Sequence, residues 1–344
     1  MTPLNIVLVS DGKPGHFRLS EGIVAAIARR RQVAVTRLEV RRPRLVPGSV
    51  LTALTYSDAW QGAIPRLLGI AARPVTACDL VVSAGGATLA ANIYLKRTYS
   101  CANIFYGSLR RYHVQDFSLV LTSYTSVSHR SNHLMTLKPS ALDPDSLPKV
   151  PETGGPPFAV GLLVGGDSGT VHFRHADWDR LLKLLDDTPH DVRWIVSNSR
   201  RTPEPVSNKI ARIAAAEPGR VQFIDVRKPD APDLVAAMTK VSVIAATIDS
   251  SSMISEAVWA RRPVVVLAPE KWDLPVLEEG YRKYLNRHGW TSEPVPLAAA
   301  TPGGILEHSK DLKPLQDNPL EQLAILIENR VPSLFGQLSS QPLS

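Results

Sequence analysis

The chain has 344 residues, of which 44% are hydrophobic and 21% charged, so it is long enough for two domains with ordinary apolar cores. The charge is uneven, because residues 1–150 carry 18 basic and 8 acidic side chains whereas residues 151–344 carry 21 and 24. The basic first half indicates that one domain meets an anionic partner. The two cysteines, Cys78 and Cys101, exclude a disulfide framework and a metal-binding spacing, and they favour a reducing compartment.

The N-terminus begins with a short apolar run, Leu4–Val9, that has no basic start and is soon followed by Asp11. This pattern predicts a buried strand and not a signal peptide. The sequence has no apolar stretch of about 18–20 residues, which predicts that no helix spans a membrane. We therefore expect a cytoplasmic protein whose contact with a membrane, if it has one, is peripheral on the inner face of the inner membrane.

Apolar runs of strand length alternate with helical patterns in the first half, which predicts βαβ units and a parallel sheet. The expected elements, in chain order, are Asn5–Ser10, Leu19–Arg31, Val33–Val40, Asp79–Ser83, Thr88–Lys96, Ser118–Thr122 and Leu134–Leu137. Six prolines and two glycines then interrupt the segment from Pro139 to Pro157, which indicates a linker.

A second alternating series follows the linker. Its expected elements are Phe158–Val164, Trp178–Leu185, Val192–Ser197, Val206–Ala216, Val221–Phe223, Leu234–Met238, Val241–Ala246, Ser252–Ala260 and Val264–Leu267. The fold class is therefore α/β, with two Rossmann-like, doubly wound domains at residues 1–145 and 156–316. Residues 317–344 form a C-terminal helix, with an amphipathic segment at Leu320–Ile327, and a tail, which can cross back to the first domain.

In the first domain, two loops that follow expected strands carry residues suited to chemistry. The first loop runs from Ser10 to His16, and in it His16 can accept a proton near neutral pH while Asp11 orients it or acts as the base itself. The loop lacks the Gly-Lys-Ser/Thr ending of a P-loop, and the alternative is a turn with a solvated histidine. The second loop carries Gly85 and Gly86, whose amides can receive an anion or a sugar, although close strand–helix packing explains two glycines equally well.

In the second domain, two further loops offer contacts to a diphosphate. Gly165 and Gly166 follow a strand and present backbone amides. The next strand ends in Ser199, Arg200 and Arg201, and two adjacent arginines can bind phosphate through paired hydrogen bonds. An ordinary pair of surface arginines is the alternative.

The strongest local signal is the segment from Asp249 to Glu256, between an expected strand and helix. Its serines offer helix caps, and the first amides of the helix form an anion site; the residues are Asp249, Ser250, Ser251, Ser252 and Met253. Glu256 lies one turn further on, where its carboxylate can bind the two hydroxyls of a ribose. A capping box does not explain Glu256, because Met253 occupies the position that Ser or Thr would need. Simple capping by Asp249 or Ser251, without a ligand, is the alternative.

Taken together, five motifs resemble the mitochondrial-fission ELM family, which is itself similar to GT-B glycosyltransferases. They are Ser10–His16, Ser83–Gly86, Gly165–Gly166, Ser199–Pro203 and Asp249–Ala257. The resemblance implies two Rossmann-like domains facing a cleft, with a nucleotide-sugar donor mainly on the C-terminal domain and an acceptor on the N-terminal one. The first loop is also similar to the acceptor-side loop of the lipid-linked N-acetylglucosaminyltransferase of peptidoglycan synthesis, which implies that His16 is the base.

From these features we expect a metal-independent glycosyltransferase that acts on an envelope glycolipid or saccharide and uses a nucleotide-sugar as substrate but no cofactor. Asp11 and His16 are the expected catalytic residues, and the acceptor side comprises Gly12, Lys13, Gly15, Gly85 and Gly86. The donor side comprises Gly165, Gly166, Ser199, Arg200, Arg201, Asp249, Ser250, Ser251, Ser252, Met253 and Glu256. No Asp-x-Asp pair follows a strand where a metal-dependent transferase would carry one, so we expect no metal.

A run of arginines, with apolar residues of Val50–Ala72 close by in sequence, suits the surface of an anionic membrane. The arginines are Arg29, Arg30, Arg31, Arg37, Arg41, Arg42 and Arg44, and a solvated arginine face is the alternative. Nucleic acid is not the expected partner, because aromatic residues do not interleave with the run. Two other functions stay open: a membrane-associated scaffold without turnover, and a nonhydrolysing nucleotide-sugar epimerase.

Overall fold

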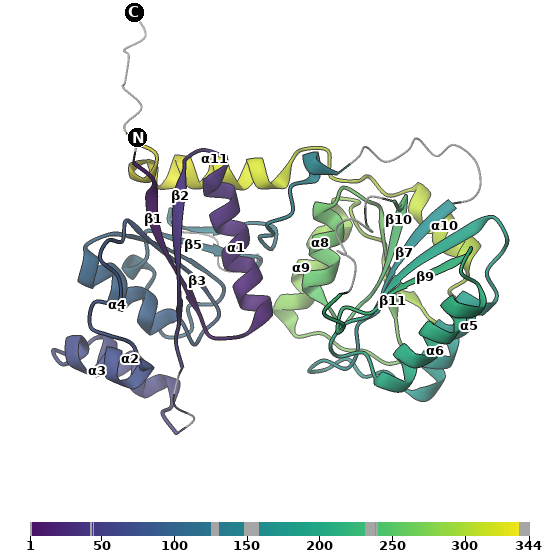
Figure 1. The fold of residues 1–344 in the computed structure, drawn as a ribbon, viewed down its shortest axis with the longest axis horizontal. Coiled ribbons are helices and arrows are strands. Elements are labelled where there is room, and N and C mark those ends of the chain that lie inside the picture. Colours follow the sequence, from purple (N-terminus) through teal and green to yellow (C-terminus); the bar gives the residue numbers. More distant parts are fainter. Residues whose placement is uncertain are drawn as a thin grey trace, which may run out of the picture. The chain divides into compact units, whose positions relative to one another are not determined.

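The computed structural model describes residues 2–41, 43, 45–124, 131–147, 158–230, 238 and 240–336. The chain divides into two compact units, which are described separately below (Figure 1). Unit 1 comprises Met1–Ala141 together with Pro319–Ser344, and unit 2 comprises Leu142–Asn318. Most of the expected helix at Leu234–Met238 and residues 148–157 of the expected linker lie outside the described residues.

Unit 1 is built on a parallel sheet of six strands in the order β2-β1-β3-β4-β5-β6. The strands are β1 (Leu4–Ser10), β2 (Val33–Glu39), β3 (Leu80–Ala84), β4 (Ala102–Tyr106), β5 (Leu119–Thr122) and β6 (His133–Met135). All five residues of β3 are buried, as expected for a central strand that is covered on both faces.

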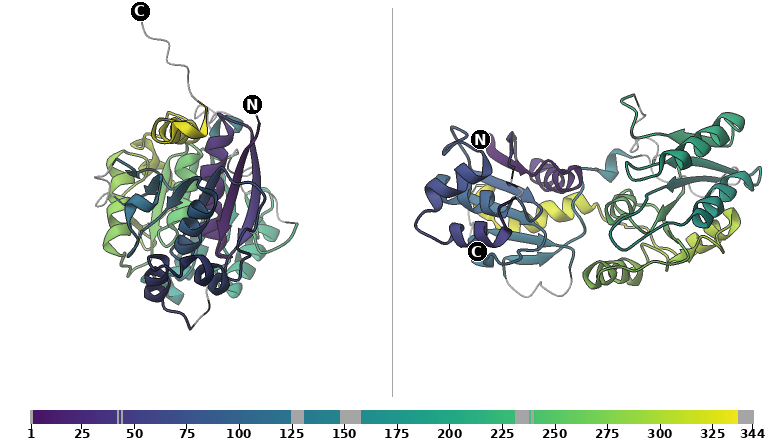
Figure 2. Two further views of the ribbon diagram at one scale, coloured as in Figure 1. Left: turned by 90° about the vertical axis from the view of Figure 1, so that its left-hand side faces the viewer. Right: turned by 90° about the horizontal axis from the view of Figure 1, so that it is seen from below.

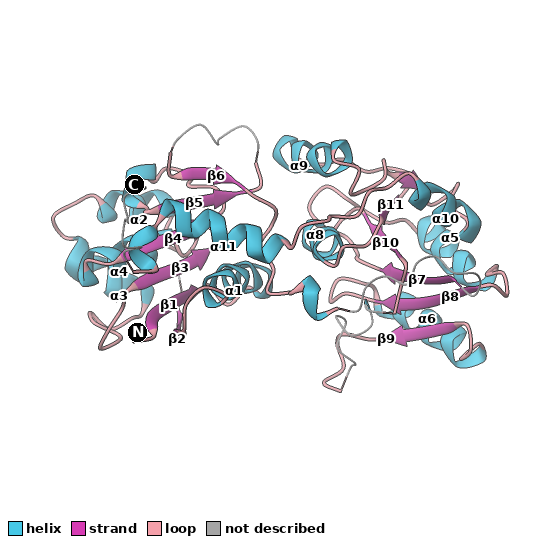
Figure 3. Ribbon diagram, turned by 90° about the horizontal axis from the view of Figure 1, so that it is seen from above, coloured by secondary structure: helices cyan, strands magenta, loops and turns pink. Residues whose placement is uncertain are grey.

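Helices cover both faces of this sheet, with α1 and α11 on one side and α2, α3 and α4 on the other (Figures 1 and 3). They are α1 (Pro14–Ala28), α2 (Gly48–Thr55), α3 (Trp60–Leu68), α4 (Leu89–Tyr99) and α11 (Pro319–Arg330), with short 3-10 turns η1 (Val114–Asp116) and η4 (Pro332–Leu334). Helix α1 begins at Pro14, because the fixed φ of proline suits the first helical position.

The C-terminal helix α11 packs against α1, and the two views of Figure 2 show it in yellow beside the purple α1. Arg29 donates to Glu321 at 2.9 Å, and Arg30 forms an ion pair with the same carboxylate. Arg31 donates to the carbonyl of Leu334. Three arginines of the basic run therefore hold the C-terminal segment of unit 1, while Arg42 and Arg44 lie outside the described residues.

Unit 2 is built on a second parallel six-stranded sheet, in the order β12-β11-β10-β7-β8-β9. Its strands are β7 (Phe158–Leu163), β8 (Val192–Ser197), β9 (Val221–Ile224), β10 (Val243–Thr247), β11 (Val264–Ala268) and β12 (Val295–Pro296). Its helices are α5 (His175–Asp186), α6 (Glu204–Ala216), α8 (Ser251–Trp259), α9 (Val276–Arg287) and α10 (Pro302–Lys310), with a 3-10 turn η3 (Pro144–Ser146). Helices α5 and α6 cover one face of this sheet, and α8 and α9 cover the other (Figure 1).

The α/β prediction with two parallel, doubly wound sheets is confirmed. Several elements were not predicted: α2, α3, β4, α9, α10 and β12. Strand β4 follows α4 after only Ser100 and Cys101, and its buried Asn103 breaks the apolar run that would have marked it. No helix in the described part of the chain is long and apolar enough to cross a membrane.

In each sheet the strand order reverses beside the first strand of the unit. Strand β1 has β2 on one side and β3 on the other, and β7 lies between β8 and β10. Ligands of open α/β sheets bind beyond the carboxyl ends of strands at such a switch point. The loops after β1 and β3 in unit 1, and after β7 and β10 in unit 2, are therefore where a site is expected.

Candidate functional site

The loop after β1 places a histidine beside a carboxylate. Nδ1 of His16 lies 2.9 Å from Oδ2 of Asp11 and 3.1 Å from Oδ1. The Asp11 side chain is 5% exposed and that of His16 is 34% exposed. Asp11 also accepts from the backbone N–H of Lys13, and Gly12 makes the turn possible with a φ of +76°. Because the carboxylate holds Nδ1, Nε2 is the ring nitrogen that can exchange a proton with a substrate.

The loop after β3 touches this histidine through its first glycine. A Cβ added to Gly85, whose φ is +86°, would stand 2.1 Å from Nδ1 of His16. A Cβ on Gly86 would stand 2.7 Å from Nε of Arg110. The glycine pair therefore seats the side chains of His16 and Arg110 against neighbouring peptide units. Nothing lies within 4 Å of the Cβ position of Gly15, so the structure gives no steric reason for that glycine.

Arg110 is a residue of this region that sequence reasoning did not identify. Its backbone is left-handed, with a φ of +53°, which is uncommon outside glycine, asparagine and aspartate. No local pattern in the sequence marks it, because its place beside Gly86 depends on the pairing of β3 with β4.

In unit 2, the loops after β7 and β10 meet through a buried carboxylate. Asp249 has a side-chain exposure of 0%, and it accepts from the Thr247 hydroxyl at 2.6 Å and from the Gly166 N–H at 3.2 Å. Arg201 donates to the same carboxylate at 2.5 Å. Burial raises the pKa of Asp249, although Thr247, Arg201 and Gly166 all act to lower it. The hydrogen-bonding capacity of Asp249 is thus directed at protein groups.

At both positions after β7, neighbouring atoms lie too close for any residue with a Cβ atom. A Cβ on Gly165 would stand 2.1 Å from the carboxylate oxygens of Asp249, and a Cβ on Gly166 would stand 2.1 Å from the carbonyl oxygen of Arg201. In the loop after β8, the Ser199 hydroxyl accepts from the N–H of Arg201. The structure thus brings Gly165, Gly166, Ser199, Arg201 and Asp249 together. Arg200 and Arg201 are both exposed, and Arg201 also reaches the buried carboxylate of Asp249.

The start of α8 is capped by Ser250, and not by the neighbouring Asp249 or Ser251. The Ser250 hydroxyl accepts from the N–H of Met253, and the Ser250 carbonyl accepts from the N–H of Ile254. The N–H groups of Ser251 and Ser252 belong to the first helical turn, which has no intrahelical acceptors. They lie at the positive end of the helix dipole, and N–H groups in such a position are suited to bind an anion.

The side chains at the start of α8 differ in their partners. The Ser251 hydroxyl donates to Glu278 of α9 at 2.6 Å, so it serves helix packing. Ser252 is exposed, and its hydroxyl lies 3.4 Å from that of Ser250. Glu256 is half-buried one turn further into the helix. Glu278 was not identified from the sequence, since its helix was not predicted.

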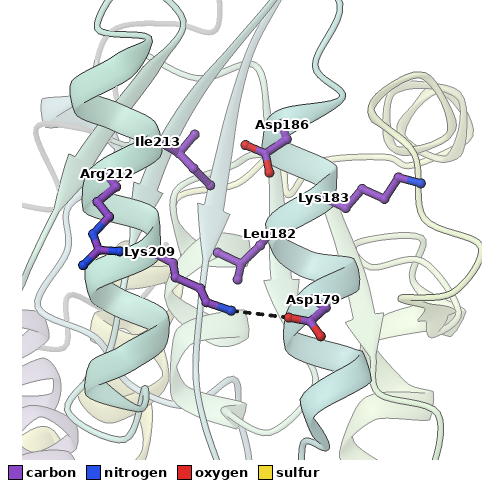
Figure 4. Close-up of a pocket in the computed structure, with 7 residues that line it drawn as sticks. All are labelled: Asp179, Leu182, Lys183, Asp186, Lys209, Arg212 and Ile213. Carbon is purple, nitrogen blue, oxygen red and sulfur yellow. Dashed lines mark hydrogen bonds and ion pairs between the residues drawn. The ribbon is translucent and has the colours of Figure 1, made fainter.

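A surface groove lies elsewhere in unit 2, on the flanks of α5 and α6 (Figure 4). Lys209 of α6 and Asp179 of α5 approach to 3.5 Å across it. Acidic, basic and apolar side chains line the groove; they are Asp179, Leu182, Lys183, Asp186, Lys209, Arg212 and Ile213. None of the expected site residues is among them. Among the residues that the structure describes, no group of three or more His, Cys, Asp or Glu side chains could hold a metal ion.

Solved structures with similar folds match almost the whole chain. A putative UDP-N-acetylglucosamine 2-epimerase from Listeria monocytogenes has a TM-score of 0.55 at 10% identity, over 98% of both chains. MnaA from S. aureus, solved with UDP, has a TM-score of 0.53 at 11% identity, over 98% of this chain and 99% of that one. UGT71G1 from Medicago truncatula, complexed with UDP-glucose, has a TM-score of 0.50 at 10% identity, over 95% and 93%.

These likenesses, with the two parallel sheets, define an α/β protein of the GT-B-like class, built from two Rossmann-like domains. The family model of mitochondrial fission ELM1 matches residues 14–293. The chain therefore belongs to the mitochondrial fission ELM1 family, and the resemblance seen in the sequence motifs is confirmed. No match was found among curated proteins.

Proposed function

We propose that this protein is a metal-independent glycosyltransferase that moves a sugar from a nucleotide-sugar to an envelope glycolipid or saccharide. The observation that carries the proposal is the start of α8, which lies at the switch point of the unit 2 sheet. There the Ser251 and Ser252 N–H groups stand at the positive end of a helix, as a diphosphate requires.

The donor contacts in this proposal come from unit 2. The diphosphate accepts hydrogen bonds from the N–H groups of Ser251 and Ser252, and exposed Arg200 adds positive charge. The carboxylate of Glu256, one turn into α8, accepts from the ribose hydroxyls. Asp249 and Arg201 act differently from the first expectation: they bind each other and thereby fix the loops after β7, β8 and β10.

The chemical step in this proposal uses the dyad of unit 1. The oxygen of the acceptor hydroxyl attacks the anomeric carbon, the bond from that carbon to the diphosphate oxygen breaks, and its electron pair leaves on the diphosphate. Nε2 of His16 takes the proton of the attacking hydroxyl, and Asp11 stabilises the imidazolium that forms. A positioned base of this kind contributes roughly a 10²–10⁴-fold acceleration.

A lipid-linked acceptor agrees with the surface of unit 1. Leu45 is 95% exposed and Val50, in α2, is 43% exposed. Arg41 lies four residues before Leu45, and its side chain is 86% exposed. Apolar anchors with basic side chains favour an anionic membrane surface, so we propose that this part of unit 1 makes peripheral contact with the inner face of the membrane.

The donor site is tested by isothermal titration with a panel of nucleoside diphosphates. We expect one of them to bind, and we expect Glu256→Ala to weaken it by about tenfold or more, since hydrogen bonds to a charged group are lost. Glu279→Ala is the matched control, because Glu279 is a half-exposed carboxylate paired with Lys283 on α9. Unchanged affinity in Glu256→Ala, or a panel that gives no binding, would contradict the proposed site.

Turnover is tested with labelled nucleotide-sugars and membrane extracts. We expect sugar transfer that His16→Ala and Asp11→Ala abolish while nucleotide affinity is kept, because both residues belong to unit 1. Nucleotide binding without sugar release would indicate a scaffold. Conversion of the donor sugar without any acceptor would indicate an epimerase, and product analysis separates the two reactions.

A further inference from the structure

Helix α9 lies beside the start of α8 and supplies a second set of charged side chains there. The hydroxyls of Ser255 and Tyr281 approach to 2.8 Å, and the Ser251 hydroxyl donates to Glu278 at 2.6 Å. Arg282 follows Glu278 by four residues, so both lie on the same side of α9. Nη2 of Arg282 donates to the carbonyl of Ile248 at 2.9 Å, just before the cap of α8.

The guanidinium of Arg282 is buried with only part of its hydrogen-bonding capacity used. Its Nε and Nη1 atoms are buried and have no hydrogen-bond partner among the described residues. Burial lowers the pKa of Arg282, while the carboxylates of Glu278 and Asp249 act in the opposite direction. A buried charged donor without acceptors costs free energy, and such groups in native proteins call for an explanation.

Two carboxylates stand close to the same turn and would by themselves repel an anion. Asp249 lies immediately before the Ser250 cap, and Glu278 reaches the Ser251 hydroxyl. Arg201 pairs with Asp249 in the loop after β8. Arg282 adds a buried positive charge here: it lies one turn along α9 from Glu278, and it donates to the carbonyl of Ile248, the residue before Asp249.

We infer that Arg282 is part of the anion site at the start of α8 and supplies, from beneath the turn, the positive charge that a pyrophosphate group requires there. This inference rests on the proposed function for the identity of the anion, the diphosphate of a nucleotide. Arg282 acts as a positioning residue: its bond to the Ile248 carbonyl holds the turn, and its charge offsets Asp249 and Glu278 so that the Ser251 and Ser252 amides can bind phosphate oxygens.

The test uses the full chain, with inorganic pyrophosphate and the best-binding nucleoside diphosphate as probes. We expect Arg282→Met to bind pyrophosphate at least tenfold more weakly, and Arg282→Lys, which keeps the charge, to retain most of the affinity. Arg287→Met is the matched control, because Arg287 is an exposed arginine on the same helix.

Thermal unfolding separates this role from a structural one. The melting temperature of Arg282→Met without ligand should fall, because the variant loses the bond to the Ile248 carbonyl and the charge that offsets Glu278 and Asp249; the readout for the anion site is therefore the shift that pyrophosphate causes. Pyrophosphate should raise the melting temperature of the wild type and not that of Arg282→Met. If Arg282→Met fails to fold, Arg282→Lys and Arg282→Gln give the same comparison of charge kept with charge lost.

The outcomes distinguish the inference from the proposed function. If the wild type binds pyrophosphate and the nucleotide, and Arg282→Met or Arg282→Gln binds them within twofold, Arg282 has a structural role and the inference alone is overturned. If the wild type binds neither probe, the proposed function and the inference are both wrong.

Discussion

The two glycine pairs of the molecule, Gly85–Gly86 in unit 1 and Gly165–Gly166 in unit 2, follow strands that border the switch points of their sheets, yet they make room for different groups. Gly85 admits the imidazole of His16, whose side chain is 34% exposed. Gly165 admits the carboxylate of Asp249, which is 0% exposed and is held by three donors.

This difference assigns the two loop pairs different tasks. A half-exposed imidazole that is oriented by one carboxylate can exchange protons with a bound molecule. A fully buried carboxylate that binds a backbone N–H, a hydroxyl and a guanidinium instead joins three loops into a fixed frame. Similar sequence signals, glycine pairs after strands, therefore accompany a histidine–aspartate pair in unit 1 and a frame that joins three loops in unit 2.

The largest effect on stability should come from Gly165→Ala. The new Cβ would stand 2.1 Å from the oxygens of Asp249, whose carboxylate is 0% exposed and is held by three donors. We expect the free energy of unfolding to fall by about 3 kcal/mol, measured by urea denaturation. Gly219→Ala is the control, because nothing lies within 4 Å of that Cβ position. If Gly165→Ala loses no more unfolding free energy than Gly219→Ala, the Asp249 carboxylate can move aside. The contrast between a fixed group beside Gly165 and a mobile one beside Gly85 would then be wrong.

Gly85→Ala should lower the free energy of unfolding less than Gly165→Ala does, but it should disturb the His16–Asp11 pair. Its φ of +86° makes alanine unfavourable by about 1 kcal/mol, and the half-exposed ring of His16 can swing away from the new methyl group. We expect the bond between His16 and Asp11 to be lost, which ¹⁵N NMR of the imidazole would report. Gly15→Ala, whose Cβ meets open space, should leave the ring in place. An unchanged imidazole spectrum in Gly85→Ala would contradict this contact.

The smallest of these effects should be on the pH dependence of the free energy of unfolding, and its direction follows from the raised pKa of Asp249. Burial raises the pKa of Asp249, so the folded state holds its proton more tightly than the unfolded state. The contribution of Asp249 to the free energy of unfolding should therefore fall as the pH rises above the ordinary carboxyl pKa of about 4. Asp249→Asn should remove this fall, as measured by urea unfolding across pH 3 to 7, roughly the carboxyl range.

Asp225 provides a control of opposite sign. Hydrogen bonds from Arg227 and Asn198 lower its pKa, so its contribution is present above about pH 4 and is lost as the pH falls below that value. The change in Asp225→Asn should stay below about 1 kcal/mol, because Arg227 and Asp225 form an ion pair near the surface. If both variants shift the pH profile in the same direction, Asp249 does not have the raised pKa of a buried scaffold group.

The sequence predicted best what depends on local patterns. The apolar runs of β1 and β10 identified buried strands, and the short spacing from Asp11 to His16 placed both side chains in one turn. It also placed a helix start close to Ser250, although the cap proved to be that residue and not either neighbour. Short polar interruptions hid other elements, as Asn103 did in β4.

Local sequence patterns could not predict which residues far apart in the chain contact each other. Gly166 and Asp249 are 83 residues apart, and they meet because β7 and β10 are neighbours in the sheet. The partners of Arg29 and Arg30 lie on α11, close to the other end of the chain. Arg282 was missed for the same reason. It reaches the segment before α8 because α9 packs beside α8, and no motif in the surrounding sequence marks it.

Amide hydrogen exchange of the full chain, measured with and without a saturating nucleoside diphosphate, tests most directly whether unit 2 holds the diphosphate. We predict slower exchange in the peptide that contains Ser251 and Ser252 and unchanged exchange in the peptide from Lys13 to His16. Unchanged exchange at the start of α8, or protection confined to the unit 1 loop, would contradict the account.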